Sequence, residues 1–325
     1  MIFLKPRGGL CNRLRAISSA LALARERNGS LTVYWCKDPG MDVKFSSFAK
    51  TPVEFEIVEF SEKGETEIAR KFKPDNKRYA NNVNNINFEN FDILKEKILS
   101  SPKDEDWAIE TCSQFHSNLD FSWFRPLDSI ETKIAATEKM LGGDYIGIHI
   151  RRTDNFKGRL YSPLYLFENA IKAEIANNPS VKFYLASDDE FAKASLTAKF
   201  GSRIFTRNNI SARFDANGGG LEDAVIDLKL LSMCKKLYGS YWSSFSEVAA
   251  EIGRVEFIQL KEFDLDKSMS YLQVECTHED MFYRNEKNLL KSEIAELKAS
   301  FAYRVGMFVT WPARKFYRLI KGKNG

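Results

Sequence analysis

Short apolar runs alternate with segments of helical periodicity from residue 145 to residue 260, and this alternation limits the fold more than any other feature. The run at 145–150 is almost entirely apolar, as expected for a strand covered on both faces. The predicted strands lie at 145–150, 181–186, 203–206, 237–240 and 255–260, and the predicted helices at 191–200, 221–236 and 245–252. Ser162 followed by Pro163 indicates another helix, with Ser162 as its N-cap. Such alternation predicts a parallel sheet with helices on both faces.

The first forty residues repeat this pattern on a smaller scale. A strand at 2–4, a helix at 13–27 that stops at Asn28-Gly29, and a strand at 31–35 are expected. One such unit at each end of the main body predicts two Rossmann-like domains that face each other, with a boundary at residues 135–142. We therefore expect a first Rossmann-like domain at 1–138, a second Rossmann-like domain at 139–265 and a helical tail at 266–325. The Asn-rich stretch at 81–85 is expected to be an exposed loop.

The composition is that of an ordinary globular protein. The 325 residues are 44% hydrophobic and 28% charged, and the formal net charge of +4 is too small to indicate nucleic acid. The five cysteines are scattered without CxxC spacing, so neither a zinc site nor a disulfide framework is expected. Neither a signal-peptide pattern nor an apolar stretch of membrane-spanning length is visible. These features predict a bacterial-type cytoplasmic protein in a reducing compartment.

Two adjacent arginines at the end of the apolar 145–150 strand form the strongest candidate site. The segment reads Ile-His-Ile-Arg-Arg-Thr-Asp from 148 to 154. Ligands of open parallel sheets bind beyond the carboxyl ends of the strands, and a guanidinium pairs bidentately with phosphate oxygens. Arg151 and Arg152 are thus suited to hold a diphosphate leaving group without a metal. The alternative is an Arg152–Asp154 ion pair that only braces the loop.

A glycine pair between the first strand and the first helix is the second candidate. Gly8 and Gly9 would allow close approach of a ligand, and the start of the following helix attracts negative charge. The segment matches neither GxxxxGK[ST] nor GxGxxG, which disfavours a P-loop and a nicotinamide dinucleotide. The alternative is a plain tight turn.

Polar residues also follow the strand predicted at 181–186. Asp188 lies near the end of the strand and is a candidate site residue, whereas Asp189 is expected to cap the next helix.

Residues 223–252 contain the fourth candidate. Asp227 lies among apolar helix neighbours and either accepts N–H groups from a guanine edge or is a surface residue. Ser243, Ser244 and Ser246 open a helix after a strand and form an anion seat, which N-capping by one of them does not exclude.

Taken in order, these motifs resemble the fucosyltransferase superfamily that includes α1,2-, α1,6- and protein O-fucosyltransferases. Residues 149–154 are similar to its HxRRxD motif, and residues 8–12 to its GGLxN motif. The stretches 185–189 and 227–251 are similar to its two later motifs. The match covers roughly residues 1–15 and 145–260.

The resemblance implies a GT-B fold, GDP-fucose as donor, inversion at the anomeric carbon and no metal or other cofactor. It implies that Arg151, Arg152 and Asp154 are catalytic and that Arg151 holds the β-phosphate. It implies donor contacts from the following residues: His149, Asp188, Asp227, Ser243, Ser244 and Ser246. On the acceptor side of the cleft it places Gly8, Gly9 and Asn12. The loop at 155–161 lacks the carboxylate that serves as base in α1,6 enzymes, which leaves the base unassigned.

Residues 300–323 mix aromatic and basic side chains without an acidic one. Such a segment suits an anionic membrane surface. It would dock the enzyme peripherally on the inner membrane near a lipid-linked glycan of surface polysaccharide or lipopolysaccharide synthesis, or pack against the body of the protein. Transfer from a different GDP-sugar is a second hypothesis. A third is nucleic-acid binding through the tail, which we do not expect because no RNA-binding motif is visible.

Overall fold

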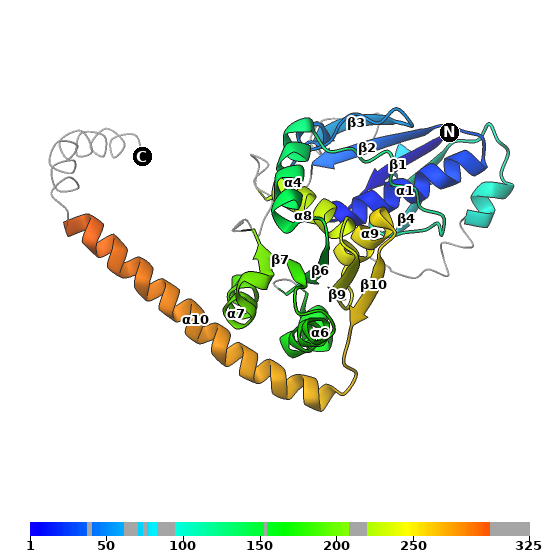
Figure 1. Ribbon diagram of the computed structural model, residues 1–325. Coiled ribbons are helices and arrows are strands. Elements are labelled where there is room, and N and C mark those ends of the chain that lie inside the picture. Colours follow the sequence, from blue (N-terminus) through cyan, green and yellow to red (C-terminus); the bar gives the residue numbers. More distant parts are fainter. Residues whose placement is uncertain are drawn as a thin grey trace, which may run out of the picture. The chain divides into compact units, whose positions relative to one another are not determined.

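The computed structural model describes residues 1–37, 41–61, 71–73, 77, 79–82, 95–152, 155–207 and 220–299. Two compact units are distinguished, residues 1–269 and residues 270–325, and each is described by itself. The first unit contains two five-stranded parallel sheets with alternating helices (Figure 1). The α/β fold class predicted from the sequence is therefore confirmed.

The first sheet has the strand order β3-β2-β1-β5-β4, and its strand pairs are parallel. Its strands are β1 (Ile2–Pro6), β2 (Leu31–Lys37), β3 (Glu56–Ser61), β4 (Tyr79–Asn82) and β5 (Trp107–Thr111). Helix α1 (Leu10–Glu26) connects β1 to β2. The loop predicted at 81–85 is wrong for Asn81 and Asn82, which pair with Glu110 and Thr111 of β5. Backbone pairing to a buried strand outweighs the poor strand propensity of asparagine here.

The second sheet has the order β10-β9-β6-β7-β8 and is also parallel. Its strands are β6 (Tyr145–Ile150), β7 (Lys182–Ser187), β8 (Ile204–Thr206), β9 (Lys236–Ser240) and β10 (Glu256–Leu260). In Figure 1, α6 (Leu164–Asn177) and α7 (Glu190–Phe200) lie on one face of this sheet, and α8 (Leu221–Ser232) and α9 (Ser244–Gly253) lie on the other. The predicted strands agree with those observed to within one residue.

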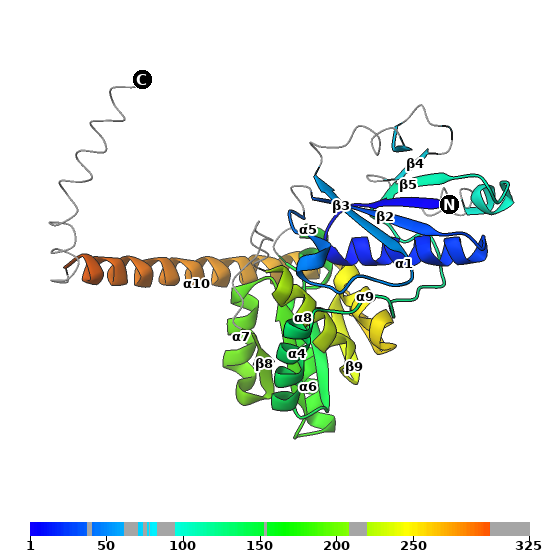
Figure 2. The same cartoon turned by 90° about the horizontal axis from the view of Figure 1, so that it is seen from above.

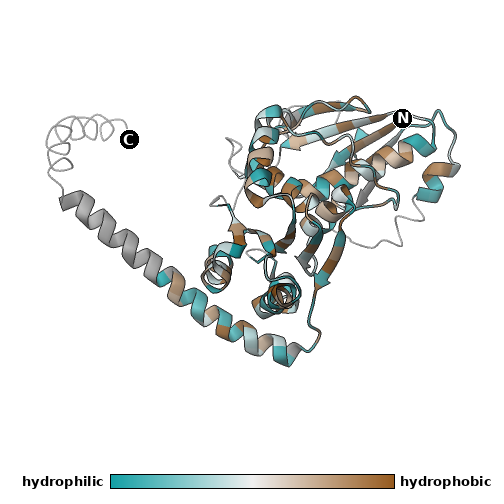
Figure 3. Cartoon of the chain, viewed as in Figure 1, coloured by the Kyte–Doolittle hydropathy of each residue, from teal (hydrophilic) through white to brown (hydrophobic). Residues whose placement is uncertain are grey.

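The connection between the two sheets is the helix α4 (Asp128–Leu141), which Gly142 ends with a left-handed φ of 86°. Helix α4 packs against α8, and α1 packs against α9 (Figure 2). One hydrophobic core contains buried residues of both sheets. Hydrophobic residues run along the strands of both sheets in Figure 3. The predicted division at residue 138 falls within α4 and stays a prediction.

Two glycines let the helices pack closely on the second sheet. A Cβ atom on Gly147 of β6 would lie 2.8 Å from Sγ of Cys234. A Cβ atom on Gly239 of β9 would lie 2.5 Å from Oγ of Ser246 on α9. Real side chains do not approach this closely, so α9 could not reach its position on β9 with a larger residue at 239.

Two local predictions are wrong. Helix α8 ends at Ser232 rather than at 236, because the strand β9 begins at Lys236 and needs a turn before it. Ser162 does not cap α6, whose N-cap is Pro163. The buried Ser162 hydroxyl accepts from the Tyr241 amide at 2.7 Å and donates to the Leu260 carbonyl at 2.6 Å. These two hydrogen bonds link the ends of β9 and β10.

The helix α10 (Leu265–Ala299) is the last described element. It begins one residue before the predicted start of the helical tail at 266. Among the described residues, none of the helices has the length and apolar character needed to span a membrane. The aromatic and basic segment at 300–323, and with it the predicted tail surface, lies outside the described residues.

Candidate functional site

Both sheets have a point where the strand order reverses, which is where open α/β sheets bind ligands. In the second sheet β6 is flanked by β7 on one side and by β9 on the other, so the reversal lies between β6 and β9. Arg151 directly follows β6, and the segment Tyr241–Ser243 follows β9. In the first sheet the reversal lies between β1 and β5, and Gly8 follows β1. The sequence motifs thus occupy both reversal points.

Asp188 organises the arginine motif. Its Oδ1 atom accepts from the Arg152 amide at 2.9 Å, and its Oδ2 atom pairs with the Arg151 guanidinium at 3.1 Å. The Arg151 amide in turn donates to Oγ of Ser240 at the end of β9, at 3.0 Å. The carboxyl ends of β6, β7 and β9 are therefore linked around Arg151. Asp188 was predicted here on its position alone.

The two arginines have different surroundings. The Arg151 side chain is 37% exposed, whereas that of Arg152 is fully buried, with its Nε atom 3.8 Å from Oδ2 of Asp189. Asp189 also caps α7, accepting from the Ala192 amide at 2.7 Å, as predicted. Only Arg151 can meet a ligand without rearrangement of the core. Asp154, the partner of the alternative Arg152 pair, lies outside the described residues.

His149 lies beneath the start of α9 rather than at the surface. Its Nδ1 atom is 2.7 Å from Oγ of Ser246, and its ring stacks on Phe245 at 4.7 Å between centroids. Burial lowers the pKa of His149 to about 3, so the imidazole is neutral at physiological pH. A neutral ring held in this way fixes the first turn of α9 against β6.

The first turn of α9 follows the end of β9, where the Ser240 hydroxyl accepts from the Arg151 amide. Ser243 is the N-cap residue by position, but its side chain makes no capping hydrogen bond within the described part of the chain. Of the three predicted serines, Ser243 and Ser246 are buried, Ser246 against His149, and Ser244 is half-buried at the start of the helix. Unsatisfied N–H groups at a helix start favour an anion.

A side chain of α1 holds the turn between β1 and α1 in place. Gly8 has a φ of 80°, and a Cβ atom there would lie 3.0 Å from Nδ2 of Asn12. The buried Arg13 guanidinium donates to the Gly8 carbonyl at 2.8 Å and to the Cys36 carbonyl at 2.7 Å. Oδ1 of Asn12 is buried without a hydrogen-bond partner in the described ranges. Sequence reasoning found the glycines and Asn12 but missed Arg13, whose apolar neighbours in the helix were its only signal.

The two motifs come together through α1 and α9. Burial raises the pKa of Cys11, and the charges of Arg15 and Arg151 partly oppose this shift. Arg15 also pairs with Glu247 of α9 at 3.6 Å. The β1–α1 turn therefore lies within electrostatic reach of Arg151. Arg15 and Glu247 were not predicted, because a helix pair from separate sheets leaves no local sequence signal.

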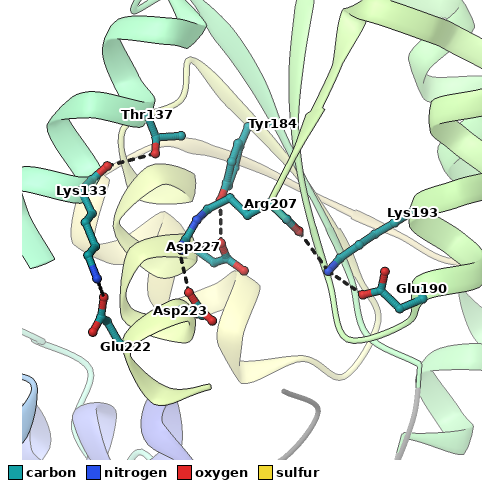
Figure 4. Close-up of polar contacts among 9 residues, drawn as sticks. All are labelled: Lys133, Thr137, Tyr184, Glu190, Lys193, Arg207, Glu222, Asp223 and Asp227. Atoms are coloured by element: carbon teal, nitrogen blue, oxygen red, sulfur yellow. Dashed lines mark hydrogen bonds and ion pairs between the residues drawn. The ribbon is translucent and has the colours of Figure 1, made fainter. Parts of the chain in front are cut away.

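Asp227 belongs to a separate polar network (Figure 4). Its Oδ1 atom accepts from the Tyr184 hydroxyl at 2.5 Å and lies 3.8 Å from Arg207, which pairs with Asp223 at 2.7 Å. Its side chain is 18% exposed, and burial raises its pKa to about 6. The surface alternative is therefore wrong, because Asp227 is mostly buried and hydrogen-bonded. A role in reading guanine stays a prediction.

No group of three or more His, Cys, Asp or Glu side chains that could hold a metal ion is present in the described part of the chain. Metal independence stays a prediction from the resemblance.

The fold and the reversal point in each sheet define a GT-B α/β protein. The cationic side chain of Arg151 lies at the carboxyl end of the strands of its second sheet. No protein-family model matches the sequence, and no curated protein matches it significantly. Solved structures do match. NodZ α-1,6-fucosyltransferase soaked with GDP-fucose is 20% identical, with a TM-score of 0.55 over 82% of this chain and 95% of that chain. The NodZ structure from Bradyrhizobium is 19% identical, with a TM-score of 0.53 over 79% and 94%.

A variant of FUT1 from Arabidopsis thaliana in complex with GDP has a TM-score of 0.56 at 12% identity, over 79% of this chain and 69% of that chain. The chain therefore has the fold of these fucosyltransferases, and the resemblance predicted from its motifs is confirmed at the level of the fold.

Proposed function

We propose that the chain is a GDP-fucose-dependent glycosyltransferase that transfers fucose, with inversion, to a hydroxyl group of a glycan acceptor. The observation that carries this proposal is the half-exposed guanidinium of Arg151, held by Asp188 at the reversal point of the second sheet. The fold match supports it, because NodZ was solved with GDP and with GDP-fucose, and the plant FUT1 variant with GDP.

The arrangement accounts for the departure of a diphosphate. When the bond between the fucosyl C1 and the β-phosphate oxygen breaks, its electron pair stays on that oxygen as added negative charge. Arg151 and the free amides at the start of α9 would stabilise this charge, and Asp188 holds the guanidinium in place beforehand. The acceptor oxygen attacks C1 from the opposite side, and its proton passes to a general base, which is unassigned.

We further propose that Asp227 reads the guanine base. An ionised carboxylate can accept from both the ring N–H and the exocyclic amino group of guanine. Tyr184 and Arg207 both contact Oδ1 of this carboxylate, and the network lies on the β7–β8 side of β6. The donor would then run across the sheet edge from this network to Arg151.

The acceptor proposal is a glycan of surface polysaccharide or lipopolysaccharide synthesis, lipid-linked and reached at the inner face of the cytoplasmic membrane. Support comes only from the mixed aromatic and basic composition of residues 300–323.

Titration calorimetry with GDP, GDP-fucose, GDP-mannose, a UDP-sugar and a short RNA tests the proposed function. We expect GDP and GDP-fucose to bind and the UDP-sugar and RNA not to bind. Equal binding of GDP-mannose would redirect the proposal to another GDP-sugar, and absence of GDP binding would end it.

A further inference from the structure

Trp242 is an exposed aromatic residue beside the proposed phosphate seat. It lies between Ser240, which binds the Arg151 amide, and Ser243, the N-cap residue of α9. It is 46% exposed, although the Lys157 ammonium lies 4.3 Å from the centroid of its ring. The large exposed hydrophobic residues of the chain include no other tryptophan among those described. None of the roles considered so far uses this ring.

The backbone at Trp242 is held in an unfavourable conformation. Its φ is 60°, and a bulky residue in the left-handed region is a strained backbone outlier. Asn155 fixes this conformation by donating from Nδ2 to the Trp242 carbonyl at 2.9 Å, while its Oδ1 atom accepts from the Gly158 amide. Glycine or asparagine would fit this backbone with less strain. The presence of tryptophan instead indicates that the ring itself is used.

The position of Trp242 in the sheet order indicates that it faces the acceptor and not the nucleoside of the donor. The sheet order is β10-β9-β6-β7-β8, so Trp242, after β9, and Asp227, against β7, lie on opposite sides of β6. Arg151 follows β6 and stands between them in this order. If the base occupies the Asp227 side and the diphosphate meets Arg151, the sugar end of the donor points toward β9. The attacking hydroxyl must arrive at that end.

We infer that Trp242 is the stacking platform for a neutral pyranose ring of the acceptor glycan. The indole offers an apolar ring face to the C–H groups of the sugar, on the side of the ring opposite the Lys157 ammonium. The inference rests on the proposed function, because it identifies the acceptor side of the same site. Trp242 positions the acceptor and takes no part in bond breaking.

The test uses the full-length chain saturated with GDP and a set of neutral disaccharides, namely lactose, cellobiose, chitobiose and maltose, with binding followed by saturation-transfer NMR. The main variant is Trp242→Asn, because asparagine accepts a positive φ and removes the ring. Trp242→Phe retains a smaller ring. Tyr271→Ala removes an aromatic residue of similar exposure from the second unit and serves as the matched control.

We expect at least one disaccharide to bind the wild-type protein. Trp242→Asn should weaken that binding roughly tenfold, the loss expected for one stacking contact, and Trp242→Phe should weaken it less. Tyr271→Ala should bind as the wild type does, and all four proteins should bind GDP equally. The inference is overturned if no disaccharide binds the GDP-loaded wild type, if Trp242→Asn binds sugar normally, or if it loses GDP affinity. Failure of the wild type to bind GDP would instead refute the proposed function.

Discussion

At the residue scale, two adjacent arginines in one motif have unlike surroundings. Arg151 is partly exposed and held by Asp188, whereas Arg152 is fully buried beside Asp189. The sequence predicts both as members of one phosphate clamp, because residue type and spacing do not reveal which of the two side chains is buried. Their different burial indicates that Arg151 can contact a ligand and that Arg152 stabilises the fold.

Arg152→Ala should therefore destabilise the fold more than Arg151→Ala. Removal of one partner from a buried pair costs about 3–5 kcal/mol, because the remaining charge of Asp189 stays buried. Arg151→Ala should change the free energy of unfolding by less than about 1 kcal/mol, since its side chain is partly solvated. Urea denaturation of both variants measures the difference. Equal stability of the two variants would contradict the assigned roles.

The raised pKa of Asp227 predicts pH-dependent binding of GDP. Burial raises this pKa to about 6, so the carboxyl group is mostly ionised at pH 7.5 and mostly protonated at pH 5. Only the ionised form accepts two donors from guanine, so GDP affinity should fall as the pH drops through 6. The slope should approach about tenfold per pH unit, as expected for uptake of one proton.

Asp227→Asn is the control for this effect, because the terminal phosphate of GDP also titrates near pH 6. The variant should bind GDP more weakly at pH 7.5 and show a shallower pH dependence between 5 and 7.5. Calorimetry across this range compares the two proteins. Parallel curves would show that Asp227 does not read the base.

At the scale of elements, close packing of α9 on β9 determines where the proposed anion seat lies. Gly239→Ala should destabilise the protein by about 1–3 kcal/mol, the usual cost of overpacking, because its Cβ would meet Ser246 and Phe257. Gly29→Ala is the matched control, since its Cβ would make only ordinary contacts. Thermal denaturation of both variants measures the effect. A stability of Gly239→Ala equal to that of the control would contradict the packing.

The strands β1, β2 and those of the second sheet were predictable from the sequence, but β3, β4, β5 and several boundaries and caps were not. Apolar runs such as 145–150 define buried strands by composition alone, and β6 has exactly the predicted limits. The end of α8 and the role of Ser162 depend on partners distant in sequence, Tyr241 and Leu260 among them. Asn81 and Asn82 joined a strand for the same reason.

At the scale of the whole molecule, the sequence predicts two facing α/β domains but not the elements that join them. The contact of α1 with α9, and the Arg15–Glu247 pair within it, bring the β1–α1 turn close to Arg151. The left-handed backbone of Trp242 also depends on a distant partner, Asn155. Such contacts depend on tertiary packing, and they cannot be predicted from each sequence segment by itself.

Deletion of residues 300–325 tests the proposed membrane contact. The deleted segment contains aromatic and basic side chains and no acidic one, so the shortened protein should lose binding to vesicles rich in anionic lipid. Binding to neutral vesicles is the control, and sedimentation with the vesicles is the measurement. Undiminished binding to anionic vesicles would exclude the tail as the anchor.

The central claim is that Arg151 receives the diphosphate of a guanosine nucleotide. Calorimetric titration of GDP into the wild type, Arg151→Ala and Arg125→Ala, whose guanidinium is exposed elsewhere, tests it most directly. A charge-assisted contact contributes about 1.5–3 kcal/mol, so Arg151→Ala should bind GDP at least about tenfold more weakly, with Arg125→Ala unchanged. Wild-type affinity in Arg151→Ala, in a folded protein, would contradict the account.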